Sequence, residues 1–378
     1  MAWSLRVARA FGIPIRVHLT FLLIVGYGAF TWGARHGTWG VLFGIASTLL
    51  LFASVALHEL GHSVVAQRRG LAVREILLLP FGGVALLDGK PKRPADELAI
   101  AVAGPAVNFV LATLLGLVGL GLLAAGALDV ASIRTLTPSA STLLALVVAG
   151  NLSLGLFNLL PIFPMDGGRV LRAILAGRFG MEKGTRWAAG FGQIAAVGLG
   201  TYAMFQGAFV LAFIAVLVFF AAGRERMEAT ALEALAGFRA GDVAQVPSVL
   251  LEPGESVSSA MIRAFRSSDS VLPVVLGERL LGVVTLTELA LSAKAGRAHE
   301  PVAAIASKAW IDVDVALPLP SLYSELERSR AIVAVVHEDG VPVGLVSSEH
   351  LGRAAAISSL GLGVEPRRPS TDAPAQGS

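Results

Sequence analysis

Long apolar runs separated by short polar segments dominate the first 223 residues of the chain. A helix needs about 20 mainly apolar residues to cross a bilayer. Four runs reach that length, at 13–33, 41–66, 98–126 and 141–165. A fifth apolar stretch, 187–223, is too long for one crossing and predicts two, with a turn near MFQG (204–207). The pattern therefore predicts a domain over residues 1–223 with six membrane-spanning helices.

The segment between the second and third runs does not follow this helical pattern. Its sequence, LAVREILLLPFGGVALLDG (71–89), has short apolar runs punctuated by Pro and Gly, which is typical of a β-hairpin. Lipid offers no partners to the backbone groups of an open strand. We therefore expect this hairpin to pack on protein or to lie at the membrane interface.

The C-terminal part of the chain is more polar and contains an internal repeat. RERMEATALEALAGFRA (224–240) predicts an amphipathic linker helix. VLPVVLGERLLGVVTLTELA (271–290) and AIVAVVHEDGVPVGLVSSEHL (331–351) each predict a strand, a turn, a second strand with Gly and the start of a helix. The interpretation is two α/β modules, 241–298 and 299–358, followed by a Pro-, Gly- and Ser-rich tail (359–378) that is predicted to be disordered.

Composition agrees with a membrane protein. The chain has 378 residues, of which 54% are hydrophobic and 15% charged, against roughly 25% charged in soluble domains. The net charge of +3 is small and gives no support to a nucleic-acid partner, so none is predicted. There is no cysteine, so any metal must be held by His, Asp or Glu. The predicted fold class is a polytopic α-helical membrane protein with a small β insertion and a cytosolic α/β module in two copies.

The distribution of Lys and Arg predicts the orientation of the helices. One side of the predicted spans carries nearly all the basic residues, whereas the other carries Arg35 and Arg134. This asymmetry places both termini in the cytoplasm and agrees with an even number of spans. A cleaved signal peptide is the alternative for the first run, but the bulky residues 31–40 offer no small-residue cleavage site.

Three ionisable side chains interrupt the second apolar run. FASVALHELGHSVVA (52–66) contains His58, Glu59 and His62. Positions i and i+4 share one face of a helix, so the two histidines can hold one ion, for which Zn²⁺ is the best candidate. Glu59 would lie close enough to act on water held at that site. Ionisable groups at membrane depth cost about 2.5–3.5 kcal/mol each, which disfavours a chance match; a structural metal or a proton relay are the other interpretations.

A catalytic zinc needs a third protein ligand, and Asp166 is the best candidate. It lies in NLLPIFPMDGGRVL (158–171), directly after the fourth run. Pro161 and Pro164 would break the helix just before it and turn the carboxylate inward. Asp88 and Glu97 are weaker candidates, because they lie beside Lys-rich loop sequence.

Two asparagines in the apolar runs have less certain roles. Asn158 could donate a hydrogen bond to a developing oxyanion, or it could satisfy a carbonyl that the prolines leave free. Asn108, in AGPAVNF (103–109), is interpreted as structural and fills a helix contact. Gly104 would let a neighbouring helix approach closely.

These motifs together resemble a known family. HELGH (58–62), PFGGVA (80–85), AGPAVN (103–108) and NLLPIFPMDGG (158–168) are similar in order and spacing to the motifs of the site-2 protease family of intramembrane zinc metalloproteases, over about residues 10–223. The resemblance implies one Zn²⁺ held by His58, His62 and Asp166, with Glu59 as general base. It implies hydrolysis of peptide bonds in or near transmembrane segments of single-span membrane proteins, such as anti-sigma-factor regulators, in a bacterial cell membrane.

The two C-terminal modules resemble a pair of CBS domains. Such pairs often bind adenine nucleotides through a hydroxyl residue and an acid three positions later. Thr285 and Glu288 match that pattern in the first copy, whereas the second copy has Ser347 and His350. The resemblance implies one nucleotide site; a platform for homodimerisation is the other interpretation.

A metal or ion transporter regulated by CBS domains is the alternative function. Two features disfavour it. A transporter has no need of Glu59 next to the ligand pair, and the apolar runs show no internal repeat of the kind many transporters have.

Overall fold

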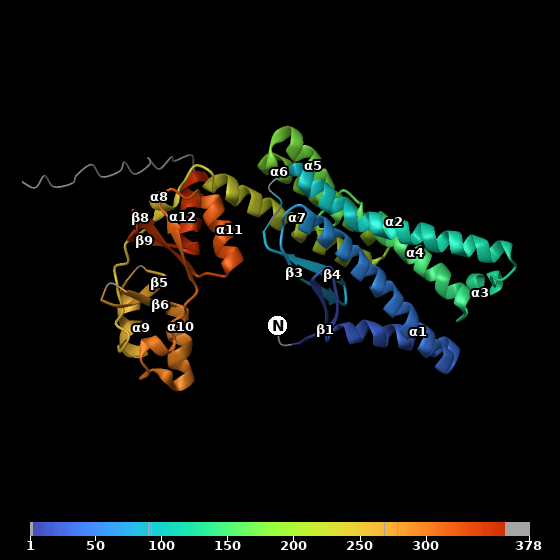
Figure 1. Ribbon diagram of the computed structural model, residues 1–378, viewed down its shortest axis with the longest axis horizontal. Coiled ribbons are helices and arrows are strands. Elements are labelled where there is room, and N and C mark those ends of the chain that lie inside the picture. The colour runs from blue at the N-terminus through green and yellow to red at the C-terminus, as the bar shows by residue number, and fades with distance from the viewer. Residues whose placement is uncertain (1–2, 90, 92, 268, 278, 360–378) are drawn as a thin grey trace, which may run out of the picture. The chain divides into compact units, whose positions relative to one another are not determined.

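The computed structural model describes residues 3–89, 91, 93–267, 269–277 and 279–359 (Figure 1). The predicted disordered tail lies almost wholly outside these residues. Contacts divide the chain into two compact units, and the division falls between Ala229 and Thr230.

The first unit begins with a sheet and not with a helix. β1 (Ser4–Ala10) and β2 (Ile13–His18) precede the first helix, α1 (Phe21–Arg68). The prediction that a membrane span begins at residue 13 is therefore wrong. In β2, Ile13 and Ile15 alternate with more exposed residues and are buried against the rest of the sheet, so the period of two that a strand requires is satisfied.

α1 supplies both of the first two predicted spans as one bent helix. Its backbone breaks only at Gly37, with φ 61° and ψ −148°, a conformation that favours glycine. The two legs then fold back on each other (Figure 1). A Cβ on Gly44 would overlap the carbonyl oxygen of Gly28, so the glycines permit this close packing.

The remaining helices of the first unit follow the apolar runs. They are α2 (Pro94–Ala124), α3 (Val130–Thr135), α4 (Ala140–Asn158), α5 (Asp166–Phe179), α6 (Met181–Phe205) and α7 (Phe209–Leu235). Within the described part of the chain, four helices are long and apolar enough to cross a membrane: α1, α2, α4 and most of α6. The predicted turn near 204–207 is confirmed, with Gly207 at φ +64°. The linker segment after Gly223 continues α7 as far as Leu235.

The predicted hairpin at 71–89 is confirmed and belongs to a larger sheet. β3 (Val73–Leu79) and β4 (Gly82–Leu87) pair antiparallel, and β3 pairs parallel with β2. The strand order is β1-β2-β3-β4, which places β4 at an edge of this sheet. Ile13, Ile15, Ile76 and Leu78 form its buried core against Val55 and Leu60 of α1, so the sheet packs on the helix that carries the His-Glu-x-x-His sequence.

The second unit contains the order helix, strand, strand, helix twice, and the second copy adds a strand before it. In the first copy α9 (Val257–Arg266) precedes β5 (Val271–Leu276), β6 (Arg279–Thr285) and α10 (Leu286–Ser292). In the second, β7 (Trp310–Asp314) and α11 (Leu319–Ser329) precede β8 (Val333–Glu338), β9 (Val341–Ser347) and α12 (Ser348–Ser359). The hairpins β5–β6 and β8–β9 share a register shift at the same position. Their inner faces contribute Val271, Val283, Val333, Val335 and Leu345 to one common core.

Shorter helical segments complete the second unit. α8 (Ala240–Val243) precedes the first copy, and a π-helix (Ala293–Arg297) and a 3₁₀ turn (Val302–Ala304) follow α10.

Candidate metal centre

The structure brings His58, His62 and Asp166 together. The two Nε2 atoms lie 3.1 Å apart, and Oδ2 of Asp166 lies 3.2 Å from Nε2 of His58 and 3.0 Å from Nε2 of His62. All three residues are buried. The histidines lie one turn apart on α1, and the aspartate is the first residue of α5. Among the described residues they form one group of side chains able to hold a metal ion.

The donor set fits zinc. Nδ1 of His62 lies 2.6 Å from the carbonyl oxygen of Ile100, which can only accept, so the ring hydrogen is on Nδ1 and Nε2 presents a lone pair. Two tetrahedral ligands at the Zn–N distance of 2.0–2.1 Å are about 3.3 Å apart, close to the separations of the three atoms. Lone pairs that converge at this distance repel one another unless a cation lies between them, so the arrangement suits a metal ion. Three ligands leave the fourth position open, as in catalytic zinc sites.

Two glycines allow Asp166 to reach this position. α4 ends at Asn158, and the chain turns through the two prolines before α5 begins. A Cβ on Gly167 would overlap the carbonyl oxygens of Leu159 and Leu160, and one on Gly168 would lie 2.7 Å from the backbone nitrogen of Phe163. The first turn of α5 therefore packs directly under the preceding loop, which fixes the carboxylate.

Glu59 lies beside the edge strand β4. A Cβ on Gly83 would overlap Cγ of Glu59 and lie 3.2 Å from its Oε1. Glu59 is half-buried and follows His58 directly in the chain. The structure therefore places the predicted base next to His58 in the chain and against the backbone of a strand.

Asn108 contacts His58 of the candidate metal site, although its sequence pattern suggested only a helix contact. Its Oδ1 lies against Nδ1 of His58, and its Nδ2 donates to Oδ1 of Asn151 at 2.9 Å. Both asparagines are fully buried. Asn151 was not among the residues that the sequence singled out. Asn158, the predicted oxyanion donor, is the half-buried last residue of α4.

A second polar cluster lies close to the site. Arg172 of α5 donates to Oε1 of Glu97 on α2 and, at 2.9 Å, to Oε2 of Glu225 on α7. Its guanidinium lies over the ring of Phe163, 5.2 Å from the centroid. Glu97, a weaker candidate ligand from sequence, therefore serves an ion pair, and Asp88 likewise pairs with Arg74.

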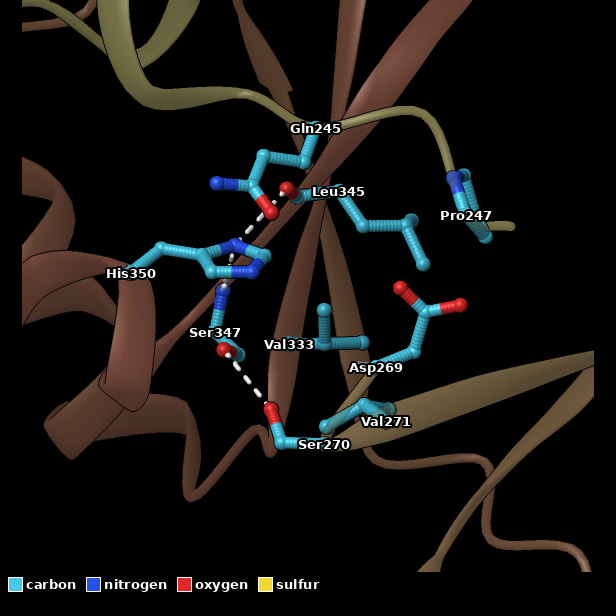
Figure 2. A pocket seen from close by; sticks show the side chains of 9 residues that line it. All are labelled: Gln245, Pro247, Asp269, Ser270, Val271, Val333, Leu345, Ser347 and His350. Carbon is cyan, nitrogen blue, oxygen red and sulfur yellow. Dashed lines mark hydrogen bonds between the residues drawn. The ribbon is translucent and has the colours of Figure 1, made fainter. Parts of the chain in front are cut away.

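The second unit has a cleft at its second copy. Its lining residues come from both copies and the segment before them: Gln245, Pro247, Asp269, Ser270, Val271, Val333, Leu345, Ser347 and His350. Figure 2 shows Ser270, Ser347 and His350 on one side and Asp269 on the other. The space measures about 260 Å³, its open mouth included. Burial lowers the pKa of His350 below 6.5, so the ring is neutral at pH 7.

The predicted nucleotide residues of the first copy bond to each other. Thr285 is the N-cap of α10: its Oγ1 accepts from the backbone nitrogen of Glu288 at 3.2 Å. Oε2 of Glu288 accepts in turn from the backbone nitrogen of Thr285 at 2.8 Å and from its hydroxyl at 2.9 Å. This arrangement is a capping box, which stabilises the start of the helix.

Comparison with known proteins defines the class. The chain is 31% identical over 366 residues to "Zinc metalloprotease MJ0392" of Methanocaldococcus jannaschii, covering 95% of this chain and 98% of that protein. The sequence model of Peptidase family M50 matches residues 46–124 and 123–199, which include the three metal-site residues. The protein is therefore a zinc metalloprotease and not an ion transporter. It belongs to Peptidase family M50, the site-2 protease family.

Solved structures add two likenesses. The Site-2 Protease from Methanocaldococcus jannaschii is 38% identical, with 59% of this chain and 95% of that chain covered and a TM-score of 0.42. A hemolysin-like protein containing a CBS domain, from Oenococcus oeni, is 16% identical, with 33% of this chain and 95% of that chain covered and a TM-score of 0.29. The two C-terminal modules remain a predicted CBS pair.

Proposed function

We propose that this metalloprotease cleaves peptide bonds within or near the transmembrane segments of single-span membrane proteins, with one Zn²⁺ held by His58, His62 and Asp166. The observation that supports it is the convergence of three buried donor residues, two of them on α1, a helix long and apolar enough to cross a membrane. A bilayer tolerates such groups only where they serve one another or a function. Bacterial regulators such as anti-sigma factors are substrates of the proposed type.

Glu59 performs the proton transfer in this proposal. Zinc bound at the site would supply Lewis acidity, which brings the pKa of water to about 7 and polarises the scissile carbonyl. Glu59 takes the proton from the attacking water and delivers it to the leaving amine. Asn158 donates to the oxygen on which negative charge develops.

The edge strand β4 binds the substrate in an extended form. A helical peptide bond is shielded by its own hydrogen bonds, so the substrate must unwind before cleavage. An unwound segment can then add to a sheet edge through main-chain hydrogen bonds. Gly83 lies against Glu59, so a peptide paired with β4 lies next to the base.

Neighbouring positions of β4 test this binding mode. Successive N–H groups of a strand point alternately to its two sides, so one of Val84 and Ala85 faces β3 and the other faces the free edge. Val84→Pro and Ala85→Pro should both lower cleavage, and the variant at the free edge should keep the thermal stability of the wild type. Full cleavage by both variants contradicts strand addition.

The membrane arrangement is also part of the proposal. The two legs of α1, together with α2, α4, α6 and the apolar start of α7, give six crossings of a cell membrane. The basic residues place both termini in the cytoplasm. The chain has no cysteine, so Arg35→Cys and Arg178→Cys can each be labelled with a membrane-impermeant reagent. The labelling tests whether these two positions lie on opposite sides of the membrane.

The second unit is proposed to be a tandem CBS pair that binds an adenine nucleotide and joins two chains in a homodimer. The repeated elements support the pair, and the cleft at the second copy marks where a ligand would contact Ser347 and His350. Calorimetry with ATP and AMP on the full chain should detect binding. Thr285→Val should abolish it if the first copy binds, and Ser347→Ala if the second does. No binding of either nucleotide contradicts this part of the proposal.

Cleavage of a membrane-anchored reporter tests the catalytic proposal. Glu59→Gln removes the base and Asp166→Asn disrupts the metal site. Each should lower cleavage by at least about 10³-fold. Bound zinc should persist in Glu59→Gln and fall in Asp166→Asn. His36→Gln, on the same helix and away from the site, is the control and should cleave normally. Equal cleavage by all variants would remove the proteolytic role of these residues.

A further inference from the structure

A chain of buried polar groups runs from the first metal ligand across three helices. Asn151 of α4 donates to the carbonyl oxygen of Val147 and to Oγ of Ser54, both at 2.9 Å. Ser54 in turn donates to the carbonyl oxygen of Leu50 at 3.2 Å. Asn108 of α2 lies between Asn151 and the imidazole of His58. Since lipid and core offer these groups no water, the network must satisfy itself.

Two backbone carbonyls fix the direction of every hydrogen bond in this chain. The carbonyls of Val147 and Leu50 can only accept, so the amide of Asn151 must point its NH₂ group toward Val147 and Ser54. A flipped amide would set its oxygen against an acceptor. The oxygen of Asn151 therefore faces Asn108 and receives its NH₂ group.

The orientation of Asn108 follows from that of Asn151. With its NH₂ group donated to Asn151, Asn108 presents only its oxygen to Nδ1 of His58. The hydrogen of a neutral His58 ring must then be on Nδ1, and Nε2 keeps the lone pair that faces Asp166 and His62. In metal sites, groups of this kind fix the tautomer and the orientation of a ligating imidazole.

We infer that Asn108 and Asn151 are positioning residues, which together hold His58 in the tautomer and orientation that bind the metal. Asn108 acts on the ring directly, and Asn151 acts through Asn108. This inference rests on the proposed zinc site. It assigns a function to the Asn of AGPAVN beyond filling a helix contact.

Substitutions of nearly equal size separate this role from packing. Asn108→Leu removes the acceptor and should lower zinc affinity by about 10–100-fold. Asn108→Asp keeps an oxygen that accepts from Nδ1 of His58, as carboxylates do in many metal sites, and should stay within about threefold of the wild type. Asn151→Leu frees Asn108 to flip and should give an intermediate loss. Thr142→Val is the control: this buried residue of α4 bonds to Ser132 and Ser139 outside the network, so zinc affinity should stay unchanged even where stability falls.

The double variant tests whether the two asparagines act in series. If Asn151 works through Asn108, Asn108→Leu/Asn151→Leu should bind zinc no more weakly than Asn108→Leu alone. Additive losses would indicate two independent packing effects and would overturn the inference.

The measurements are zinc affinity, by competition with a chromophoric chelator, and the visible spectrum of the Co²⁺ form, both on the purified full chain in detergent. Wild-type affinity and spectrum in Asn108→Leu overturn the inference, as does an equal loss in Asn108→Asp. If Asn108→Leu does not fold, the contrast between Asn108→Asp and Asn151→Leu decides. Failure of the wild type to bind zinc would instead contradict the proposed metal site.

Discussion

At the scale of single residues, glycines shape the site as much as the proposed ligands do, because they have no side chain. Gly104 of α2 leaves room for the imidazole of His62, since a Cβ there would overlap the ring. Gly83 does the same for Glu59. The histidine pair was predictable from local spacing, because His58 and His62 are one turn apart. The Asn108–Asn151 contact was not, because it depends on how two helices pack.

Gly104→Ala should lower zinc affinity at least about tenfold, since the added methyl group displaces the His62 ring and a factor of ten is about 1.4 kcal/mol. Gly116→Ala on the same helix meets nothing within 4 Å. It should bind zinc as the wild type does and be equally or more stable, because Ala favours helix over Gly. Metal affinity by chelator competition measures both; equal affinity in the two variants contradicts the packing argument.

The lowered pKa of His350 predicts a pH dependence of local stability. Burial is the main cause, and Arg353 adds to it. Because the folded pKa lies below the unfolded value of 6.5, this contribution to stability is complete above pH 6.5. It is lost as the pH falls from there through the folded pKa. Hydrogen exchange of peptides from β9 and α12, corrected for the slower intrinsic exchange at lower pH, should therefore show weaker protection below pH 6.5 in the wild type, and a smaller loss of protection in His350→Gln.

At the scale of elements, Arg172 ties three helices together near the site. Its partners lie on α2 and α7, and its own helix begins with Asp166. Glu97 lies one turn before Ile100, whose carbonyl holds His62. The same ion cluster therefore steadies the helices that supply or orient two of the three proposed ligands.

Arg172→Met should lower the unfolding temperature markedly, because it leaves the buried carboxylate of Glu97 unpaired, at a cost of about 3–5 kcal/mol. Arg172→Met/Glu97→Met removes both charges and should recover much of that loss. Glu225→Gln should cost at most about 1 kcal/mol, since its side chain is one-third exposed. Thermal unfolding in detergent ranks the stability of the three variants. An Arg172→Met variant as stable as the wild type would contradict the prediction.

Element boundaries show where sequence patterns were insufficient. The hairpin at 71–89, the turn near 204–207 and the break after Asn158 were predictable, because Gly and Pro mark each of them. β2 was not, since its apolar residues directly precede an apolar helix and join the same run. The bend of α1 depends on one backbone conformation at Gly37 and on contacts between its legs, which periodicity does not encode.

At the scale of the whole molecule, one helix belongs to both units. α7 begins in the apolar part of the chain, carries Glu225 and ends at Leu235, beyond the division at Ala229. The metal site lies wholly within the first unit, and the cleft wholly within the second. Metal removal should therefore affect the two units differently.

A chelator should destabilise the first unit and leave the second unchanged. A ligand at 100 times its dissociation constant stabilises the folded state by about 2.7 kcal/mol, and that contribution disappears with the metal. Hydrogen exchange should accelerate around His58 and the start of α5, while β5–β6 and β8–β9 keep their protection. Added zinc should restore the original rates; acceleration in both units alike would contradict this.

The position of β4 at the sheet edge has a consequence for selectivity. A chain that docks on a strand edge offers its main-chain amides, and its side chains project above and below the sheet. Such a protease would accept many sequences and reject those whose helices resist fraying. Replacing one docking amide of a peptide by an ester should then weaken cleavage more than exchanging a neighbouring Leu for Val.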